Sequence, residues 1–319
     1  MRICLLVAGW LLALVSWNGT SQSVCGDDGL FWDDAALIEQ SEFRDSVMGD
    51  VAKLVSDCDQ ESSADDSYQW HLLPDGLLWH SYLAAAQEPR ISTILFQTND
   101  EGIFWDATVG GRVGLLRYGT PGAQDPSGWQ WDLEGAVITR LDLLHAEDVE
   151  SMDYRFGTEI TAAEGPWAMK FGYFHISSHV GDEYLIRNST FTRVNYVTES
   201  WIVGGSYRPR EDVRLYGEFV NSFRASGGAK RYQLQTGAEY TPPAQEAKRG
   251  APFAAVNLNF REAVDWDVST TVQAGWSFQS PDSGRRIRFG MQYGDGPTSQ
   301  FSFFERRESY LGGGVWFDY

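Results

Sequence analysis

The sequence predicts an all-β protein that closes into an antiparallel barrel and spans a membrane. After Arg90, runs of about ten residues alternate apolar and polar side chains, with Gly, Pro, Asp and Asn between them. This is the pattern of barrel strands. No later stretch reaches the roughly 18 apolar residues that a membrane helix needs. The chain also ends in a half-apolar strand, residues 310–319, whose last residue is the aromatic Tyr319.

The N-terminus has the features of an export signal. Arg2 precedes an apolar run, residues 3–17, and the small residues of Ser21-Gln22-Ser23 follow it, which predicts a secretory signal peptide over residues 1–23. An exported chain without a membrane helix can satisfy its backbone in a membrane only as a closed barrel. We therefore predict a closed antiparallel outer-membrane β-barrel of about 12 strands over residues 90–319, located in the cell outer membrane.

An acidic segment, residues 24–89, separates the signal peptide from the barrel, and we expect it in the periplasm. It is predicted to be partly helical, with one helix over residues 34–55. The apolar stretch Leu72–Ala86 is expected to pack at the periplasmic mouth or to lead into the first strand. Cys25 and Cys58 form an even pair in an oxidising compartment, which predicts one disulfide.

The amino-acid composition agrees with a barrel, and the net charge limits which kinds of partner the chain can bind. Aromatic residues make up 14% of the chain, with 13 Trp and 14 Tyr, and suit the girdles at the two membrane interfaces. The net charge of −19 argues against nucleic-acid binding. It is compatible with acidic loops that hold a divalent cation beside lipid phosphates. No cofactor is expected, and outer-membrane lipid is the expected partner.

The alternating runs predict twelve strands, and an even number brings both ends of the barrel to the periplasmic side. The expected spans are 91–98, 104–117, 129–142, 150–161, 166–179, 193–207, 211–224, 231–241, 252–260, 266–279, 284–294 and 310–319. In the last strand, the spacing of Gly314, Phe317 and Tyr319 resembles the terminal signature of bacterial outer-membrane barrels. This resemblance implies that the strand pairs with the first one and is recognised by the outer-membrane assembly machinery.

Charged residues of both signs fall on the face opposite the apolar one. In a barrel of about twelve strands they would share a narrow lumen, where pairing offsets their desolvation. These residues are Asp106, Arg112, Asp132, Glu134, Arg140, Asp153, Arg155, Glu159, Arg214, Glu218, Glu239, Arg261, Arg286 and Arg288.

Six short segments resemble a bacterial family, domain of unknown function 1207. The resemblance covers roughly Gln69–Tyr319 and omits the acidic segment. It implies a shared architecture and no assigned activity, so no catalytic residue is carried over. The segments are residues 73–79, 114–119, 172–184, 214–218, 252–256 and 315–319.

The densest polar stretch runs off the end of the fifth expected strand. Tyr173, His175, Ser177 and His179 share one face. Since Cα atoms two residues apart on a strand are about 6.6 Å apart, the His175 imidazole can reach the Ser177 hydroxyl. A His-x-Ser pair looks like the base and nucleophile of outer-membrane phospholipases and lipid A deacylases, which add an Asn or Glu from the neighbouring strand. Those families place Asn directly after the serine, where this chain has Ser178.

Orientation decides between the readings of this stretch. Phe174 and Ile176 look lipid-facing, which would turn His175 and Ser177 into the lumen, and we favour this arrangement. The opposite assignment stays open, because Trp167, Met169 and Phe171 continue the histidine face.

Two functions are compatible with the sequence. The favoured one is a non-enzymatic, structural or channel-type barrel with a charged, networked lumen. In it a binding cluster of Tyr173, His179, Asp182 and Glu183 is linked to Arg214 and Glu218. The alternative is a lipid-directed hydrolase that uses His175 and Ser177. No metal site is predicted, since His175 and His179 would be about 13 Å apart on a strand.

Overall fold

The computed structural model describes residues 68–99, 102–243 and 249–319. The predicted signal peptide, the helix over 34–55 and the Cys25–Cys58 disulfide lie outside these ranges. The compact unit that contains the described residues spans Asp66–Tyr319. It therefore begins before the predicted boundary at residue 90.

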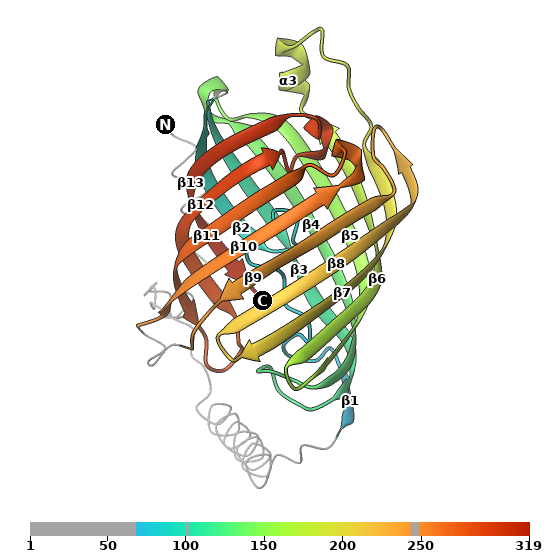
Figure 1. Cartoon of the computed structure of the whole chain (residues 1–319), viewed down its shortest axis with the longest axis vertical. Coiled ribbons are helices and arrows are strands. Elements are labelled where there is room, and N and C mark those ends of the chain that lie inside the picture. Colours follow the sequence, from blue (N-terminus) through green and yellow to red (C-terminus); the bar gives the residue numbers. More distant parts are fainter. Residues whose placement is uncertain (1–67, 100–101, 244–248) are drawn as a thin grey trace, which may run out of the picture. The chain divides into compact units, whose positions relative to one another are not determined.

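The predicted closed antiparallel barrel is confirmed (Figure 1). The sheet in the described ranges has 13 strands, and all but the first form a ring that closes where β13 pairs with β2, for example Gly314 with Ile94. These strands match the twelve predicted spans within a few residues. Their bounds are β2 (Ile91–Thr98), β3 (Ile103–Gly119), β4 (Gly128–Asp142), β5 (Asp148–Glu164), β6 (Trp167–Val180), β7 (Val197–Arg210), β8 (Val213–Ser226), β9 (Tyr232–Tyr240), β10 (Ala251–Arg261), β11 (Val268–Gln279), β12 (Arg286–Pro297) and β13 (Arg307–Asp318).

The chain enters the barrel wall twice before the ring is complete. A short strand, β1 (Gln69–Leu72), pairs with the end of β3, and β2 later pairs with the beginning of β3. Between them, residues 73–90 leave the wall and run inside the ring; we call them the plug. Where the wall is interrupted, the Tyr319 hydroxyl donates to the Gly110 carbonyl oxygen at 3.1 Å.

The connections define two rims. The C-terminal rim is the end where β13 finishes, and it carries the connections 120–127, 165–166, 211–212 and 280–285. The opposite end, the α3 rim, carries α3 (Asp182–Arg187) and the short 3-10 helices η1 (Leu143–His145), η2 (Glu262–Val264) and η3 (Phe301–Phe303). In the described part of the chain, no helix has the length and apolarity needed to cross a membrane.

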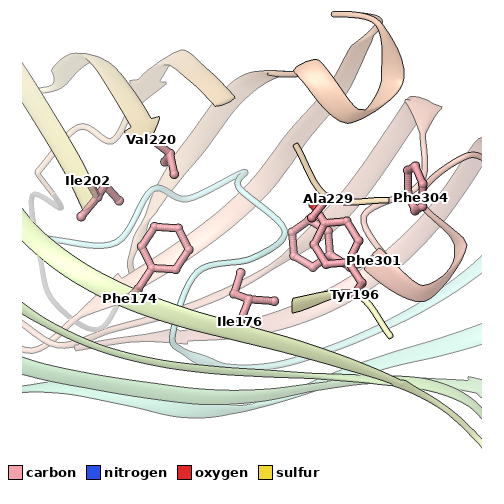
Figure 2. Packing of buried hydrophobic residues seen from close by; sticks show 8 residues of the cluster. All are labelled: Phe174, Ile176, Tyr196, Ile202, Val220, Ala229, Phe301 and Phe304. Atoms are coloured by element: carbon pink, nitrogen blue, oxygen red, sulfur yellow. The ribbon is translucent and has the colours of Figure 1, made fainter. Parts of the chain in front are cut away.

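The apolar core lies inside the ring and is built from both ends. From the C-terminal rim, the plug buries Trp79, Tyr82 and Leu83, each at most 5% exposed. From the α3 rim, η3 brings Phe301 against Tyr196, and the two stacked rings have their centroids 4.8 Å apart. Both rings belong to a cluster with Phe174 and Ile176 of β6 (Figure 2). The stretch Leu72–Ala86 was expected only to pack at the mouth or to lead into a strand, so the burial of its residues Leu77–Trp79 and Tyr82–Ala85 inside the ring is a correction.

The predicted charges lie in the lumen as expected, and all except Asp106 and Arg286 are buried. Arg112 bonds to both Glu134 and Glu159, while Lys170 lies 3.3 Å from Glu159 and 2.8 Å from Glu218. Pairing of this kind is what a desolvated charge requires. Lys170 is an addition to the predicted set.

Candidate functional site

Alternation along β6 places His175 and Ser177 on the outer surface of the barrel, not in the lumen. Phe174 and Ile176 are each 4% exposed and point inward, toward Tyr196 and Phe301 (Figure 2). The predicted inward orientation of the histidine and serine is therefore wrong. The physical reason is that a loop from the far end of the chain supplies an apolar partner inside the lumen, so Phe174 and Ile176 are apolar residues of the lumen, whereas Met169 and Phe171 of the same strand face outward.

A carboxylate from the neighbouring strand completes the outward group. His175 and Glu199 are direct partners in the β6–β7 register, and the His175 Nδ1 atom lies 3.0 Å from Glu199 Oε1. The Tyr173 hydroxyl donates to the other carboxylate oxygen. Both members of the ion pair are partly exposed, His175 at 32% and Glu199 at 20%. Since the carboxylate engages Nδ1, the Nε2 atom is the ring nitrogen open to another partner, but the hydrogen bonds of the described residues do not join it to Ser177.

Sequence reasoning missed Glu199. The residue lies 24 positions after His175, and its role depends on which residue of β7 stands opposite His175. The signal that could have identified it is the register between β6 and β7, and this register depends on the length of the connection between the two strands.

The surroundings of the group change from charged to aromatic along the strands. On the α3 side, Arg193 Nη2 lies 3.0 Å from His179 Nδ1, and Arg224 of β8 stands opposite Glu199 in the register. On the other side, the centroid of the Trp201 ring lies 5.8 Å from that of Phe171 and 5.5 Å from that of Phe223. The polar group thus sits at the boundary between an aromatic belt and a charged rim.

Residues 65–319 match the family model described as "Protein of unknown function (DUF1207)". The chain belongs to this family. No curated protein matches it.

Among solved structures, the DUF1207 chain is similar to three barrels. Outer membrane phospholipase A from Escherichia coli has 10% identity and a TM-score of 0.48, covering 74% of this chain and 91% of that chain. The calcium-bound phospholipase dimer from Salmonella typhi has 11% identity and a TM-score of 0.49, covering 74% and 92%. The KdgM porin has 9% identity and a TM-score of 0.42, covering 72% and 98%.

The remaining predicted binding residues of the DUF1207 barrel do not join the outward group. Arg214 and Glu218 point into the lumen, where Arg214 lies 3.3 Å from Glu239 and Glu218 pairs with Lys170. The predicted link between them and the Tyr173 cluster is therefore wrong, because the wall of the barrel separates the two faces. Asp182 and Glu183 are exposed at the start of α3, and the described residues contain no cluster of three metal-binding side chains.

A separate cavity of about 600 Å³ opens at the C-terminal rim. It ends against the plug, and four basic residues are among those that line it: His80, Arg208, Arg214 and Arg286. Burial of His80, together with the nearby cations Arg208 and Arg214, lowers the pKa of its imidazole to about 4. His80 is therefore neutral at physiological pH and adds no charge to this mouth.

Proposed function

We propose that this barrel is an outer-membrane hydrolase that cleaves acyl esters of membrane lipids at Ser177. The observation that carries the proposal is the outward His175, whose Nδ1 atom is held by Glu199 at 3.0 Å while Ser177 lies two residues away on the same face. A serine hydrolase needs a nucleophile, a base and a group that orients the base, and these three residues supply them.

The expected chemistry follows from the residue types of this group and from the face of β6 that His175 and Ser177 share. The Ser177 oxygen attacks the carbonyl carbon of the lipid ester as His175 Nε2 takes the hydroxyl proton. The ester C–O bond breaks, His175 returns the proton to the leaving alcohol, and an acyl group remains on the serine. Water activated by the same nitrogen then releases the fatty acid. Glu199 stabilises the imidazolium in both steps.

The outward position supports a membrane lipid as the substrate. The outer wall carries exposed apolar side chains such as Val109, Met169 and Phe171, which are 69%, 62% and 54% exposed. Such a surface is suited to acyl chains, whereas the opposite face of the strands is charged and paired. Together with the predicted signal peptide, this supports a location in the outer membrane.

The filled lumen favours the hydrolase over a channel. The plug and the 298–306 connection meet inside the ring, where Gln87 donates to the Ser299 carbonyl oxygen at 2.7 Å. A solute path along the barrel axis would have to displace these segments. The outer wall, by contrast, is directly accessible to lipid.

The test is release of fatty acid by the detergent-solubilised protein from phosphatidylglycerol and from lipid A. We expect Ser177→Ala to abolish release, and Glu199→Gln to lower kcat on the order of 10²–10⁴-fold because the histidine loses its orienting charge. Ser226→Ala, a substitution at an exposed serine of the same rim, serves as the matched control. A fluorophosphonate should label Ser177 and no control serine. Failure of the wild-type protein to release fatty acid from either lipid, or equal release by Ser177→Ala, would reject the hydrolase.

A further inference from the structure

We propose that the outward site selects lipids that carry a phosphate group, which Arg193 and Arg224 hold beside the reacting ester. The inference rests on the proposed function for its chemistry. It adds a class of substrate, namely acyl esters whose phosphate lies only a few bonds from the cleaved carbonyl.

Arg224 lies in the same row as the proposed catalytic residues. The strand register runs from His175 through Glu199 to Arg224, one residue on each of three neighbouring strands. Because neighbouring strands are about 4.8 Å apart, the Cα atom of Arg224 is roughly 10 Å from that of His175. Its side chain is exposed, and its charge acts on the Glu199 carboxylate that stands opposite it. A long, exposed guanidinium at this distance can also reach a phosphate on a lipid whose ester is at Ser177.

Arg193 approaches the site from the other direction. It lies on the connection between α3 and β7, and its guanidinium contacts His179 Nδ1 at 3.0 Å. The His179 ring itself packs edge-on against Tyr154 at 5.5 Å, which fixes the place where Arg193 rests. Within the described part of the chain, no carboxylate forms an ion pair with Arg193, whose contact here is the imidazole ring. The two arginines therefore flank the strand that carries His175 and Ser177.

The aromatic belt fixes the direction in which a lipid would lie. Phe171 and Trp201 are 54% and 47% exposed and lie farther from the α3 rim than His175. Acyl chains would cover these rings, which places the ester at Ser177 and the phosphate within reach of Arg224, level with His175, and of Arg193, beside His179. Hydrogen bonds from guanidinium to phosphate are short and strong, and phosphate is the anionic group of lipids that arginine recognises best.

The first experiment compares substrates that differ only in phosphate. Hydrolysis of phosphatidylglycerol and of a diacylglycerol with the same acyl chains is measured in mixed micelles. In the Arg193→Gln/Arg224→Gln variant, we expect the ratio of kcat/KM for the two lipids to fall at least tenfold, mainly through KM. Lys230→Gln removes a cation from an exposed residue of the same rim and should leave the ratio unchanged. An unchanged ratio in the double arginine variant would overturn the inference while leaving the hydrolase intact.

A second experiment measures binding without turnover, so that the two proposals fail separately. Brominated phosphatidylglycerol is titrated into the Ser177→Ala variant, and quenching of tryptophan fluorescence is measured. The contribution of Trp201 is obtained by subtracting the quenching of the Ser177→Ala/Trp201→Phe variant. In the double arginine variant, we expect the lipid concentration that gives half-maximal quenching to rise at least tenfold. If the wild-type protein releases no fatty acid but the binding still depends on the arginines, the hydrolase is rejected and the phosphate site stands. Binding that is equal with and without the arginines would reject the phosphate site.

A third arm separates the two sources of such a phosphate. Unlabelled lipid A and unlabelled phosphatidylglycerol compete with the brominated lipid in turn. The stronger competitor identifies the natural source, and either result supports a phosphate-bearing ligand. Competition by the diacylglycerol as strong as that by both phosphate lipids would contradict the inference.

Discussion

Arg112 illustrates what a charged residue needs in the lumen. Its side chain is 1% exposed and bonds to Glu134 and Glu159, which are themselves fully buried. Each carboxylate also has a second cation, Arg155 at 2.7 Å from Glu134 and Lys170 at 3.3 Å from Glu159. Arg112, Glu134 and Glu159 thus each contact two opposite charges, and removal of one of them leaves its partners desolvated without full compensation.

We predict that Arg112→Met lowers the free energy of unfolding by about 3–5 kcal/mol, because two buried carboxylates lose a cation. The matched variant is Arg210→Met, which removes an arginine from the exposed pair with Asp212 and should have a small effect. The measurement is the urea midpoint of the folded band on unheated gels. Equal midpoints for the two variants would show that the network contributes nothing to stability.

At the scale of elements, the plug is the part of the fold that alternation does not reveal. Arg90 holds it in a compact turn, with its guanidinium donating to the carbonyl oxygens of Leu83 at 2.7 Å and of Tyr82. The Leu83 amide donates to Glu239 at 2.7 Å. These bonds satisfy backbone groups that no neighbouring strand pairs, which allows an irregular segment to stay buried.

We expect Leu83→Ala to destabilise the barrel by about 2–5 kcal/mol, as loss of a buried leucine does elsewhere. Leu83 is 5% exposed and packs with Ala84, Phe253 and Trp316. Leu72→Ala provides the same chemical change at a residue that is 80% exposed and should cost little. Heat-modifiability in detergent measures both, and a destabilised Leu72→Ala with an unaffected Leu83→Ala would contradict the plug.

The strands were predictable because period-two alternation survives any tertiary context. The inward face of β6 was not predictable, because the apolar side chains of Phe174 and Ile176 pack inside the lumen and do not contact lipid. The apolar run of the plug has the same pattern whether it packs at a mouth or within the ring. Glu199 could not be assigned to the site without the register between β6 and β7. Local patterns therefore gave the elements, and long-range contacts decided the site.

For the whole molecule, the filled lumen predicts low conductance. The wild-type protein in planar bilayers should show no stable open channel, because the plug and the 298–306 connection occupy the axis. Replacement of residues 75–88 by a Gly-Ser linker should produce current steps, provided that circular dichroism shows the β-sheet to be retained. Large, steady conductance of the wild-type protein would be the contrary result.

The pairing of β13 with β2 has a consequence for the order of assembly. It joins Ile91 to Phe317, and closing so long a stretch is entropically costly and slow. The plug is anchored on both sides, by β1 and by β2, to the same edge of β3. Entry into a finished ring would require these anchors to detach. We therefore expect the sheet to form around the plug, and the pairing of β13 with β2 to be the last part of the wall to form.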